Sequence, residues 1–334
     1  MQLRFIGQAG VVEHPVDLLP DLLRRSDGVV WLDIPTFDEQ AQGLLRDVVG
    51  VHPLAIRDCA QRNQVPTFRV YPDHVFLVLH APQPGQAGHV HSIELDQIVG
   101  ERYLVTVHGP LSAAADPAAA RVEVDALERR LASGKLLPEH AYELSFVLAD
   151  AVAERLDACI TRFTAELWNL EYRFQAVVAD GRAGHLSDPE RFLDELFRTR
   201  HGFLVARTQA AMSRGLFARL HKIEAFGPGG GQKLLDDAVD QFDHLRDMAD
   251  GERENLQGTI DFYQARTNTE LTVAAERLAV IAAITLPVTA MSSVLGMNLI
   301  VNDATRPIGL ATAVLCMVVM SALLLRWAKR QGWW

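Results

Sequence analysis

Residues 278–302 read LAVIAAITLPVTAMSSVLGMNLIVN and carry no charged side chain. Residues 307–325 read PIGLATAVLCMVVMSALLL and are equally free of charge. About 20 apolar residues in a helix cross the roughly 30 Å hydrocarbon core of a bilayer, so each run is long enough to span it. Only residues 303–306 separate the runs, which predicts an antiparallel helical hairpin in a membrane. The alternative, two buried helices of a soluble domain, is disfavoured because both runs are apolar on all sides.

The flanks of this hairpin predict its orientation. Cations and tryptophans follow the second run: Arg326, Trp327, Lys329, Arg330, Trp333 and Trp334. Positive residues favour the cytoplasmic side, and tryptophans favour the membrane–water interface. Because two crossings return the chain to its starting side, we expect both termini in the cytoplasm and the chain in the inner or plasma membrane. The start, MQLRFIGQAGVVEHP, has no long apolar run, so we expect no cleavable signal peptide.

The formal charge is divided unevenly between the two parts of the chain. The 334 residues carry −10 in total, residues 278–334 carry +3, and residues 1–277 therefore carry −13. An acidic body disfavours nucleic-acid binding, which needs a basic surface, and favours cationic partners. The three cysteines lie far apart, at 59, 159 and 316, so no zinc or redox spacing is present.

Residues 1–112 have the pattern of a mixed α/β domain. Strands are expected at Gly28–Ile34, Val75–His80, Ser92–Val99 and Tyr103–His108, with helices at Phe37–Val49 and Pro53–Gln61. Long helical stretches follow at Ala113–Gly134, Glu139–Ala179 and Pro189–Phe226. Breaks are expected at GRAGHLSD (181–188) and GPGGG (227–231).

Residues 232–277 are expected to form a stalk helix that continues into the first apolar run, because no proline interrupts the chain from Gln232 to Leu286. Carboxylates recur along one face at heptad spacing: Asp236, Asp240, Asp243, Asp247, Asp250 and Glu254. An apolar stripe runs beside them: Leu235, Val239, Phe242, Ala249, Leu256, Ile260 and Tyr263. Two interpretations stay open. The carboxylates form a solvated face beside a packing face, or they form a wall at a subunit interface where Mg²⁺ would relieve their repulsion.

The first apolar run has features of a helix that lines a water-filled path. Its polar residues are Thr285, Thr289, Ser292 and Ser293. Pro287 frees a backbone carbonyl that neighbours or water must satisfy. The second run is almost wholly aliphatic and is expected to face lipid. Two helices cannot enclose a path, so transport would require an oligomer. The alternative for the hydroxyls is a hydrogen bond to their own backbone.

The first run ends in Gly296-Met297-Asn298. A C-terminal hairpin whose first helix ends in this tripeptide, after a long acidic helix and an α/β domain, resembles the CorA family of divalent-cation channels and transporters. Other segments resemble the family in the same order: His52-Pro53-Leu54 with Asp58, Tyr103–His108, Glu143-Leu144 with Asp150, and Phe242-Asp243-His244.

The resemblance implies an α+β cytoplasmic domain with a long stalk helix and two C-terminal transmembrane helices, assembled as a homopentameric funnel. The expected segments are an α/β domain at 1–112, a helical region at 113–231, a stalk at 232–277, a pore-lining helix at 278–298, an outer loop at 299–307, a second transmembrane helix at 308–326 and a cytoplasmic tail at 327–334. Expected partners are other copies of the chain, divalent cations and the membrane, with no nucleic acid.

The resemblance also assigns roles to residues. Gly296, Met297 and Asn298 would form the outer mouth, where amide carbonyls from five chains meet a hydrated cation. The implied pore positions share one helical face: Thr272, Ala275, Leu278, Ala282, Leu286 and Thr289. Leu278 and Leu286 would form an apolar constriction that closes by dewetting. The implied basic ring at the cytoplasmic mouth is Arg326, Lys329 and Arg330. The candidates for a regulatory metal site, where cytoplasmic Mg²⁺ would hold the channel closed, are Asp237, Asp240 and Asp243.

The implied ion is Mg²⁺, both transported and regulatory, with Co²⁺ and Ni²⁺ as further ions and no other cofactor. Three departures from the family pattern leave the ion open, and the first is that Ala275 and Thr272 stand where larger or amide side chains are common. Leu295 stands where magnesium members usually have tyrosine, and the outer loop has one carboxylate, Asp303, opposed by Arg306. A proton-coupled Zn²⁺ transporter resembling ZntB is therefore the alternative within the family.

Two other classes of protein are alternatives. A membrane-anchored enzyme is disfavoured because the sequence has no phosphate-binding glycine loop, nucleophile elbow or metal-ligand pair at helical spacing. His89 and His91 are interpreted as surface residues. A membrane sensor or scaffold that does not transport stays open, because pore lining depends on oligomerisation.

Overall fold

Seven strands form one sheet among the residues that the computed structural model of the chain describes, which are 1–85, 89–110, 116–134, 136–179, 189–223, 230–299 and 307–330. The strands are β1 (Gln2–Gly7), β2 (Gly10–His14), β3 (Gly28–Ile34), β4 (Thr67–Val70), β5 (His74–Pro84), β6 (Val90–Gly100) and β7 (Tyr103–His108). Their order is β2-β1-β3-β7-β6-β5-β4. β3 and β7 pair in parallel and all other neighbours are antiparallel.

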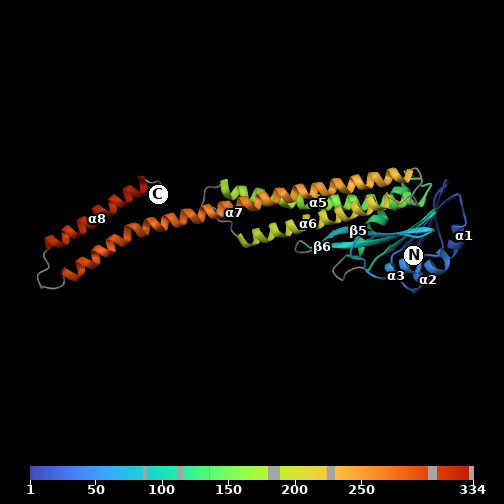
Figure 1. Cartoon of the computed structure of the whole chain (residues 1–334), viewed down its shortest axis with the longest axis horizontal. Coiled ribbons are helices and arrows are strands. Elements are labelled where there is room, and N and C mark those ends of the chain that lie inside the picture. The colour runs from blue at the N-terminus through green and yellow to red at the C-terminus, as the bar shows by residue number, and fades with distance from the viewer. Residues whose placement is uncertain are drawn as a thin grey trace. The chain divides into compact units, whose positions relative to one another are not determined.

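One face of this sheet packs against short helices from the N-terminal part of the chain (Figure 1). The helical elements there are η1 (Val16–Leu18), α1 (Leu19–Leu23), α2 (Glu39–Leu44), the π-helical turn η2 (Leu45–Val49) and α3 (Pro53–Ala60). The Asp38 carboxylate caps α2 by accepting the N–H of Ala41 at 2.8 Å. Leu32, Phe76 and Val105 from the strands are fully or almost fully buried in this core.

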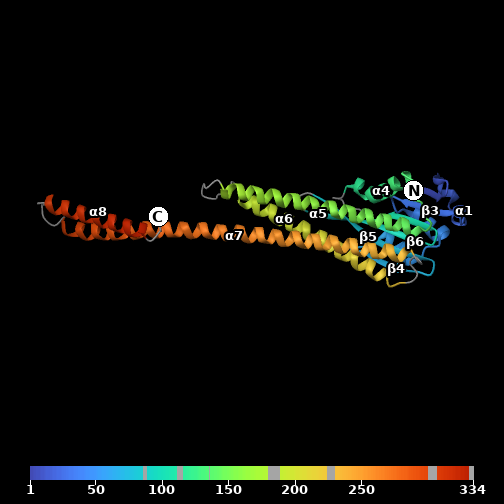
Figure 2. The same cartoon turned by 90° about the horizontal axis from the view of Figure 1, so that it is seen from above.

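Longer helices cover the opposite face of the sheet (Figure 2). They are η4 (Pro117–Arg121), α4 (Val122–Ala132), α5 (Ala141–Ala179) and α6 (Pro189–Leu220). On α6, a Cβ at position 202 would lie 2.4 Å from the ring of Phe163, so Gly202 lets α5 and α6 approach closely. The Gln209 amide of α6 donates to Ser92 of β6 at 2.7 Å, which ties the helix to the sheet.

The chain divides into two compact units, one of residues 1–179 and 186–257 and the other of residues 180–185 and 258–334. Helix α7 (Gly230–Leu299) contributes to both. Within the first unit, the ring of Phe242 stacks on that of Phe217 with centroids 5.6 Å apart, and Gln241 donates to Asp150 of α5 at 2.9 Å. Leu235, Phe242, Ala249, Leu256 and Ile260 are buried, which confirms the apolar stripe as a packing face.

The second unit consists of the C-terminal part of α7 and helix α8 (Pro307–Arg330), which lie side by side in both views (Figures 1 and 2). Both contain stretches long and apolar enough to cross a membrane, with mean hydropathies of 1.7 and 1.9. Only 6% of each stretch is buried within the protomer. The two C-terminal apolar helices expected from the sequence are therefore present, and lipid or other chains must cover them.

The helices and strands follow the expected pattern with a few corrections. The four expected strands are present, with β5 and β6 longer than expected, whereas β1, β2 and β4 and helix α1 were not anticipated. The helix expected at 37–49 begins at Glu39 and changes to a π-helical turn at Leu45. The break expected at 227–231 ends earlier than predicted, because α7 already begins at Gly230. Residues 181–188, 227–229 and 300–306 lie outside the described residues.

Candidate functional site

The six predicted pore positions are all exposed in the single chain, and this exposure alone does not separate a pore face from a lipid face. Leu278 and Leu286 are 67% and 68% exposed. Thr272, Ala275, Ala282 and Thr289 are exposed too, and most neighbouring side chains on this part of α7 share that state. Val280 is the buried exception, at 1%.

The threonine hydroxyls on this part of α7 bond to their own helix. Thr272, Thr285 and Thr289 each donate to the carbonyl four residues earlier, at 2.9, 2.9 and 2.8 Å. The backbone alternative left open by the sequence is therefore correct for the protons of Thr285 and Thr289, two of the four hydroxyls that it concerned. Because each proton is committed to the helix, each oxygen keeps its remaining lone pairs as acceptors for a hydrated cation.

The tripeptide Gly296-Met297-Asn298 lies in the last turn of α7, which ends at Leu299. The last four carbonyls of a helix have no intrahelical donor, and this end carries a partial negative charge. The backbone therefore offers oxygens and a favourable dipole for a cation. A Cβ added at Gly296 would meet no described atom within 4 Å, so no contact with the described residues requires this glycine. Of the outer loop expected at 299–307, Leu299 belongs to α7 and Pro307 to α8. Residues 300–306 and the side chains of Leu295, Met297 and Asn298 lie outside the described residues.

The acidic stripe of α7 is largely paired with cations of the same chain. Asp243 forms ion pairs with Arg214 of α6 at 3.2 Å and with Arg246 at 2.7 Å. Asp250 pairs with Arg207 and Arg253, both at 2.9 Å. Burial raises the pKa of Asp250, but the two arginines outweigh burial and the net pKa is lowered.

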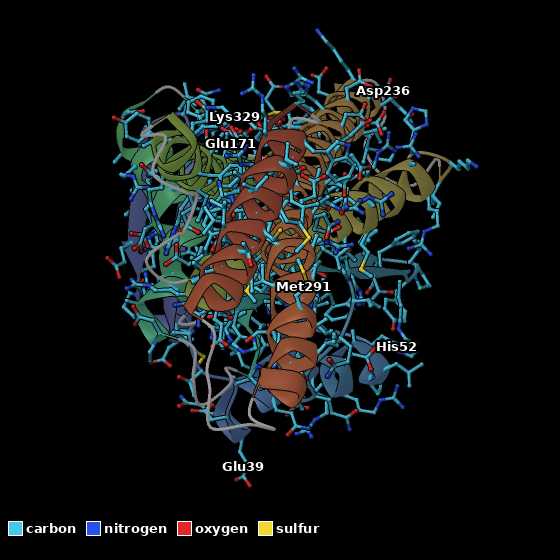
Figure 3. The ribbon with its side chains drawn as sticks, turned by 90° about the vertical axis from the view of Figure 1, so that its left-hand side faces the viewer. Glu39, His52, Glu171, Asp236, Met291 and Lys329 are labelled. Carbon is cyan, nitrogen blue, oxygen red and sulfur yellow. The ribbon has the colours of Figure 1, made fainter. Side chains whose placement is uncertain are left out.

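The remaining carboxylates of the stripe are more open. Asp236 lies 3.1 Å from the His221 ring (Asp236 is labelled in Figure 3), and Asp247 pairs with Arg246. Asp237 and Asp240 are exposed and form no ion pair within the described part of the chain. Among the described residues, no group of three or more His, Cys, Asp or Glu side chains could hold a metal ion. A regulatory ion at the stalk would thus need ligands from a second chain.

The predicted basic ring lies at the end of α8, where Figure 3 labels Lys329, while Met291 marks α7. Arg326, Lys329 and Arg330 are exposed. None of the three is ion-paired with a described residue, in contrast to the arginines beside Asp243 and Asp250.

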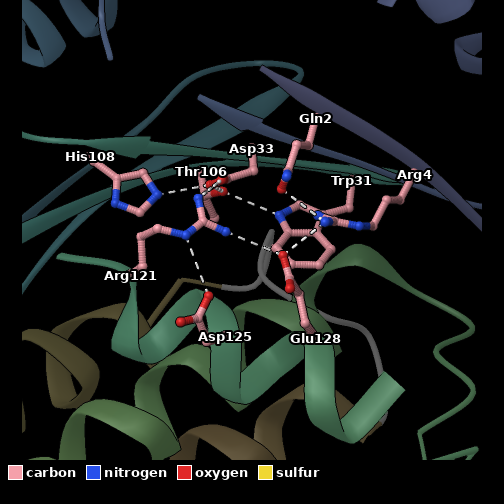
Figure 4. Close-up of polar contacts among 9 residues, drawn as sticks. All are labelled: Gln2, Arg4, Trp31, Asp33, Thr106, His108, Arg121, Asp125 and Glu128. Carbon is pink, nitrogen blue, oxygen red and sulfur yellow. Dashed lines mark hydrogen bonds and ion pairs between the residues drawn. The ribbon is translucent and has the colours of Figure 1, made fainter. Parts of the chain in front are cut away.

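A buried polar network between the sheet and α4 was not anticipated (Figure 4). The Asp33 carboxylate is fully buried and accepts hydrogen bonds from Thr106 at 2.6 Å and from Arg121 at 3.3 Å, and it lies 2.9 Å from Nε2 of His108. Burial raises the pKa of Asp33, but His108, Thr106 and Arg121 outweigh burial, so the pKa is lowered. The network fastens α4 to β3 and β7.

A second buried group lies on the other face of the sheet. Asp96 is fully buried, and neither of its carboxylate oxygens has a conventional hydrogen-bond donor among the described groups. Burial and the nearby Glu94 carboxylate raise the pKa of Asp96 well above its ordinary value. The same burial and charges raise the pKa of the Cys59 thiol, so Cys59 is an unreactive core residue.

A cavity of about 520 Å³ lies where the ends of β5 and β6 meet α5 and α6, and His89 lines it. Four of its charged lining residues pair with one another, Arg162 with Glu166 at 3.1 Å and Arg173 with Glu195 at 2.5 Å. A fifth, Arg198, pairs with Asp194 outside the lining. These pairs provide no activated nucleophile or base, and the cavity gives no support to the enzyme alternative.

A comparison with known proteins found a matching protein family and a similar protein. A family model described as CorA-like Mg²⁺ transporter protein matches residues 26–330. A protein of Bacillus subtilis (strain 168) named "Putative metal ion transporter YfjQ" is 23% identical over 309 residues, which are 91% of this chain and 89% of that protein.

Two solved structures are similar in fold. The complete CorA magnesium transporter from Methanocaldococcus jannaschii matches with a TM-score of 0.80 and 14% identity over 100% of this chain and 99% of that chain. The ZntB cytoplasmic domain from Vibrio parahaemolyticus RIMD 2210633 matches with a TM-score of 0.57 and 10% identity over 79% of this chain and 98% of that chain. At these identities both matches concern the fold alone.

Proposed function

The chain belongs to the CorA-like Mg²⁺ transporter family, whose model matches residues 26–330, and from this membership we propose that it carries divalent cations across the cell membrane, with Mg²⁺ as the main ion. The observation that carries the proposal is the coincidence of this match with two exposed apolar helices, the first of which ends in Gly296-Met297-Asn298. Both termini lie in the cytoplasm in this proposal, and five copies form the path. We assign no enzymatic activity.

In the proposed path a hydrated cation first meets the C-terminal end of α7. The Asn298 amides of five chains and the unpaired backbone carbonyls would bind the water shell without stripping it, which suits an ion that dehydrates reluctantly. Deeper positions are Thr289, Leu286, Ala282, Leu278, Ala275 and Thr272. A membrane potential of 100 mV supplies about 4.6 kcal/mol for two charges, which is enough to drive uptake.

The direct test is competitive flux of Mg²⁺ against Zn²⁺ into proteoliposomes of the purified chain, at two external pH values. We expect Mg²⁺ flux that follows the membrane potential and is little changed by a proton gradient. Zn²⁺ flux that rises with the proton gradient and exceeds Mg²⁺ flux would favour the ZntB-like alternative. Absence of any flux for Mg²⁺, Co²⁺, Ni²⁺ or Zn²⁺, with internal divalent cations removed, would favour a sensor or scaffold.

We further propose that a cytoplasmic divalent cation closes the path by binding stalk carboxylates between subunits. The candidates are Asp237 and Asp240, which have no ion pair within the described residues, and Asp243, which would have to share its carboxylate with Arg214 and Arg246. The test variant replaces Asp236, Asp237, Asp240 and Asp243 with Asn. We expect it to lose inhibition by internal Mg²⁺, and unchanged inhibition would exclude this site.

A matched control removes four exposed carboxylates elsewhere: Glu13→Gln, Asp17→Asn, Glu39→Gln and Asp157→Asn. It should keep the inhibition, because it changes the net charge equally without touching the stalk. Loss of inhibition in the control as well would assign the effect to overall charge.

A further inference from the structure

The cationic end of α8 has no counter-charge within the described part of the protomer. Arg326, Lys329 and Arg330 lie within five residues of one another, all exposed, and no described carboxylate pairs with them. Elsewhere in the chain arginines are commonly held by carboxylates, as Arg207 is by Asp250. Three uncompensated cations at the end of an apolar helix call for an anion from outside the chain.

A groove of about 750 Å³ joins these cations to an apolar surface. Its other lining residues are Val319, Ala322, Leu323 and Leu325. The steps between these positions place most of them along one side of α8, from Val319 to Arg330, which is about 16 Å of helix. Ala328 marks the opposite side, because it is 97% buried (3% exposed). Most of the groove is therefore lined by apolar side chains, and its end near the C-terminus of α8 is lined by cations.

An anionic glycerophospholipid has the matching chemistry. Its acyl chain is apolar, and its phosphodiester accepts several charge-assisted hydrogen bonds from guanidinium and ammonium groups. Basic residues that flank a transmembrane helix on the cytoplasmic side attract anionic headgroups. A second copy of the same surface would fit less well, since it would bring three more cations to the same place.

We propose that this groove binds one anionic phospholipid, with the phosphate on Arg326, Lys329 and Arg330 and an acyl chain along Val319, Ala322 and Leu323. The inference rests on the membrane location in the proposed function, not on transport itself. The bound lipid neutralises cations that would otherwise repel a permeating divalent ion at this end of the protein.

The test measures lipid retention by the purified full chain, by native mass spectrometry after exposure to equal amounts of phosphatidylglycerol and phosphatidylcholine. We expect at least tenfold preference for phosphatidylglycerol. Arg326→Gln/Lys329→Gln/Arg330→Gln should abolish the preference. The control Arg129→Gln/Lys222→Gln/Lys233→Gln removes the same charge from exposed sites outside the apolar helices and should keep it.

Loss of the flanking cations could also change the orientation of the chain in the membrane, so a second variant that keeps these cations is needed. Ala322→Trp keeps every charge and fills the groove, and it should lower phosphatidylglycerol retention at least tenfold. Equal retention of both lipids by the wild type, or undiminished phosphatidylglycerol retention by Ala322→Trp, would overturn the proposal. Displacement of the lipid by inorganic phosphate would overturn the lipid assignment in favour of a phosphate site. Lipid preference without ion flux would leave this inference standing and contradict the proposed transport.

Discussion

The two compact units of this chain differ in how far their large apolar side chains are buried. In the first unit Trp31, Phe217 and Phe242 are at most 1% exposed, and three layers of strands and helices surround them. In the second unit Leu286 is 68% exposed and Leu315 is 63% exposed. The first unit completes its own core, whereas the second has an apolar surface that only lipid or other chains can cover.

The same contrast holds for charges. Asp243 and Asp250 of the first unit each bind two arginines of the same chain, while Arg326, Lys329 and Arg330 of the second have no partner among the described residues. Contacts within a single chain therefore account for the stability of the first unit, whereas they account for only part of the stability of the second. Variants in the two units should therefore change different observables.

The largest stability loss is expected at the contact of α7 with α6. Phe242→Ala removes a fully buried ring stacked on Phe217 and should lower the free energy of unfolding by about 3–5 kcal/mol. Thermal unfolding of the purified full chain measures the loss. Phe197→Ala, at a side chain 57% exposed, should change it by less than about 0.5 kcal/mol. Equal effects of the two variants would mean that α7 does not pack as described.

The next largest effect concerns the network in Figure 4. Asp33→Asn leaves Arg121 and His108 beside a neutral amide and should cost about 3 kcal/mol near pH 7. Because the folded pKa of Asp33 is lowered, its stabilisation is present above the unfolded value of about 3.9 and is lost as the pH falls through the folded value. The difference between variant and wild type should thus shrink in acid, and a difference independent of pH would contradict the assignment.

The contribution of Asp96 to stability should depend on pH in the opposite direction. Its pKa is raised, so its favourable protonated form is present at low pH and its stabilisation is lost as the pH rises from about 3.9 through the folded value. Asp96→Asn keeps the shape without a charge and should raise the stability at pH 8 by about 1 kcal/mol. Unfolding curves across pH check this, and a destabilised variant at pH 8 would show that the carboxylate is satisfied by a group outside the protomer.

The smallest stability effect is expected in the second unit, where truncation of an exposed leucine can be compared with truncation of a buried one in the first unit. Leu286→Ala truncates a side chain that is 68% exposed and should change the stability of the folded chain by less than about 0.5 kcal/mol. Flux at high internal Mg²⁺ should rise, because the proposed constriction would be wider. Leu256→Ala makes the same truncation at a fully buried position and should cost about 2–5 kcal/mol without a direct effect on the path. A large stability loss in Leu286→Ala would place this residue in a protein core.

The sequence predicted the elements that have long, uniform patterns. Helix α7 was anticipated because no proline interrupts residues 232–286, and the two apolar helices because charge is absent from both runs. β2 and β4 were missed because they are short strands at the two edges of the sheet. β1 was missed because its residues, like those of β2 and β4, mix polar with apolar side chains. Their place in the sheet depends on partners far away in the chain.

Long-range polar contacts were the least predictable part. Asp33 and His108 meet only because β3 and β7 pair in parallel, and neither strand alone indicates that register. One signal could have revealed the pairing of the acidic stripe. Arg207 and Arg214 are seven residues apart on α6, and Asp243 and Asp250 are seven residues apart on α7. When the two helices run antiparallel, these equal spacings bring each arginine opposite one aspartate, Arg207 opposite Asp250 and Arg214 opposite Asp243. The residues of the outer mouth stay predictions, since the Met297 and Asn298 side chains lie outside the described residues.

The central claim is that the end of the first apolar helix admits a hydrated divalent cation. It is tested most directly by Mg²⁺ uptake into proteoliposomes, with the wild type compared with Asn298→Ala and with Asn302→Ala as the control. In the proposed pentamer, the loss of one amide carbonyl from each of five chains would remove on the order of 3 kcal/mol of binding. Uptake by Asn298→Ala should therefore fall about a hundredfold while the control transports normally. Normal uptake by Asn298→Ala would contradict the account.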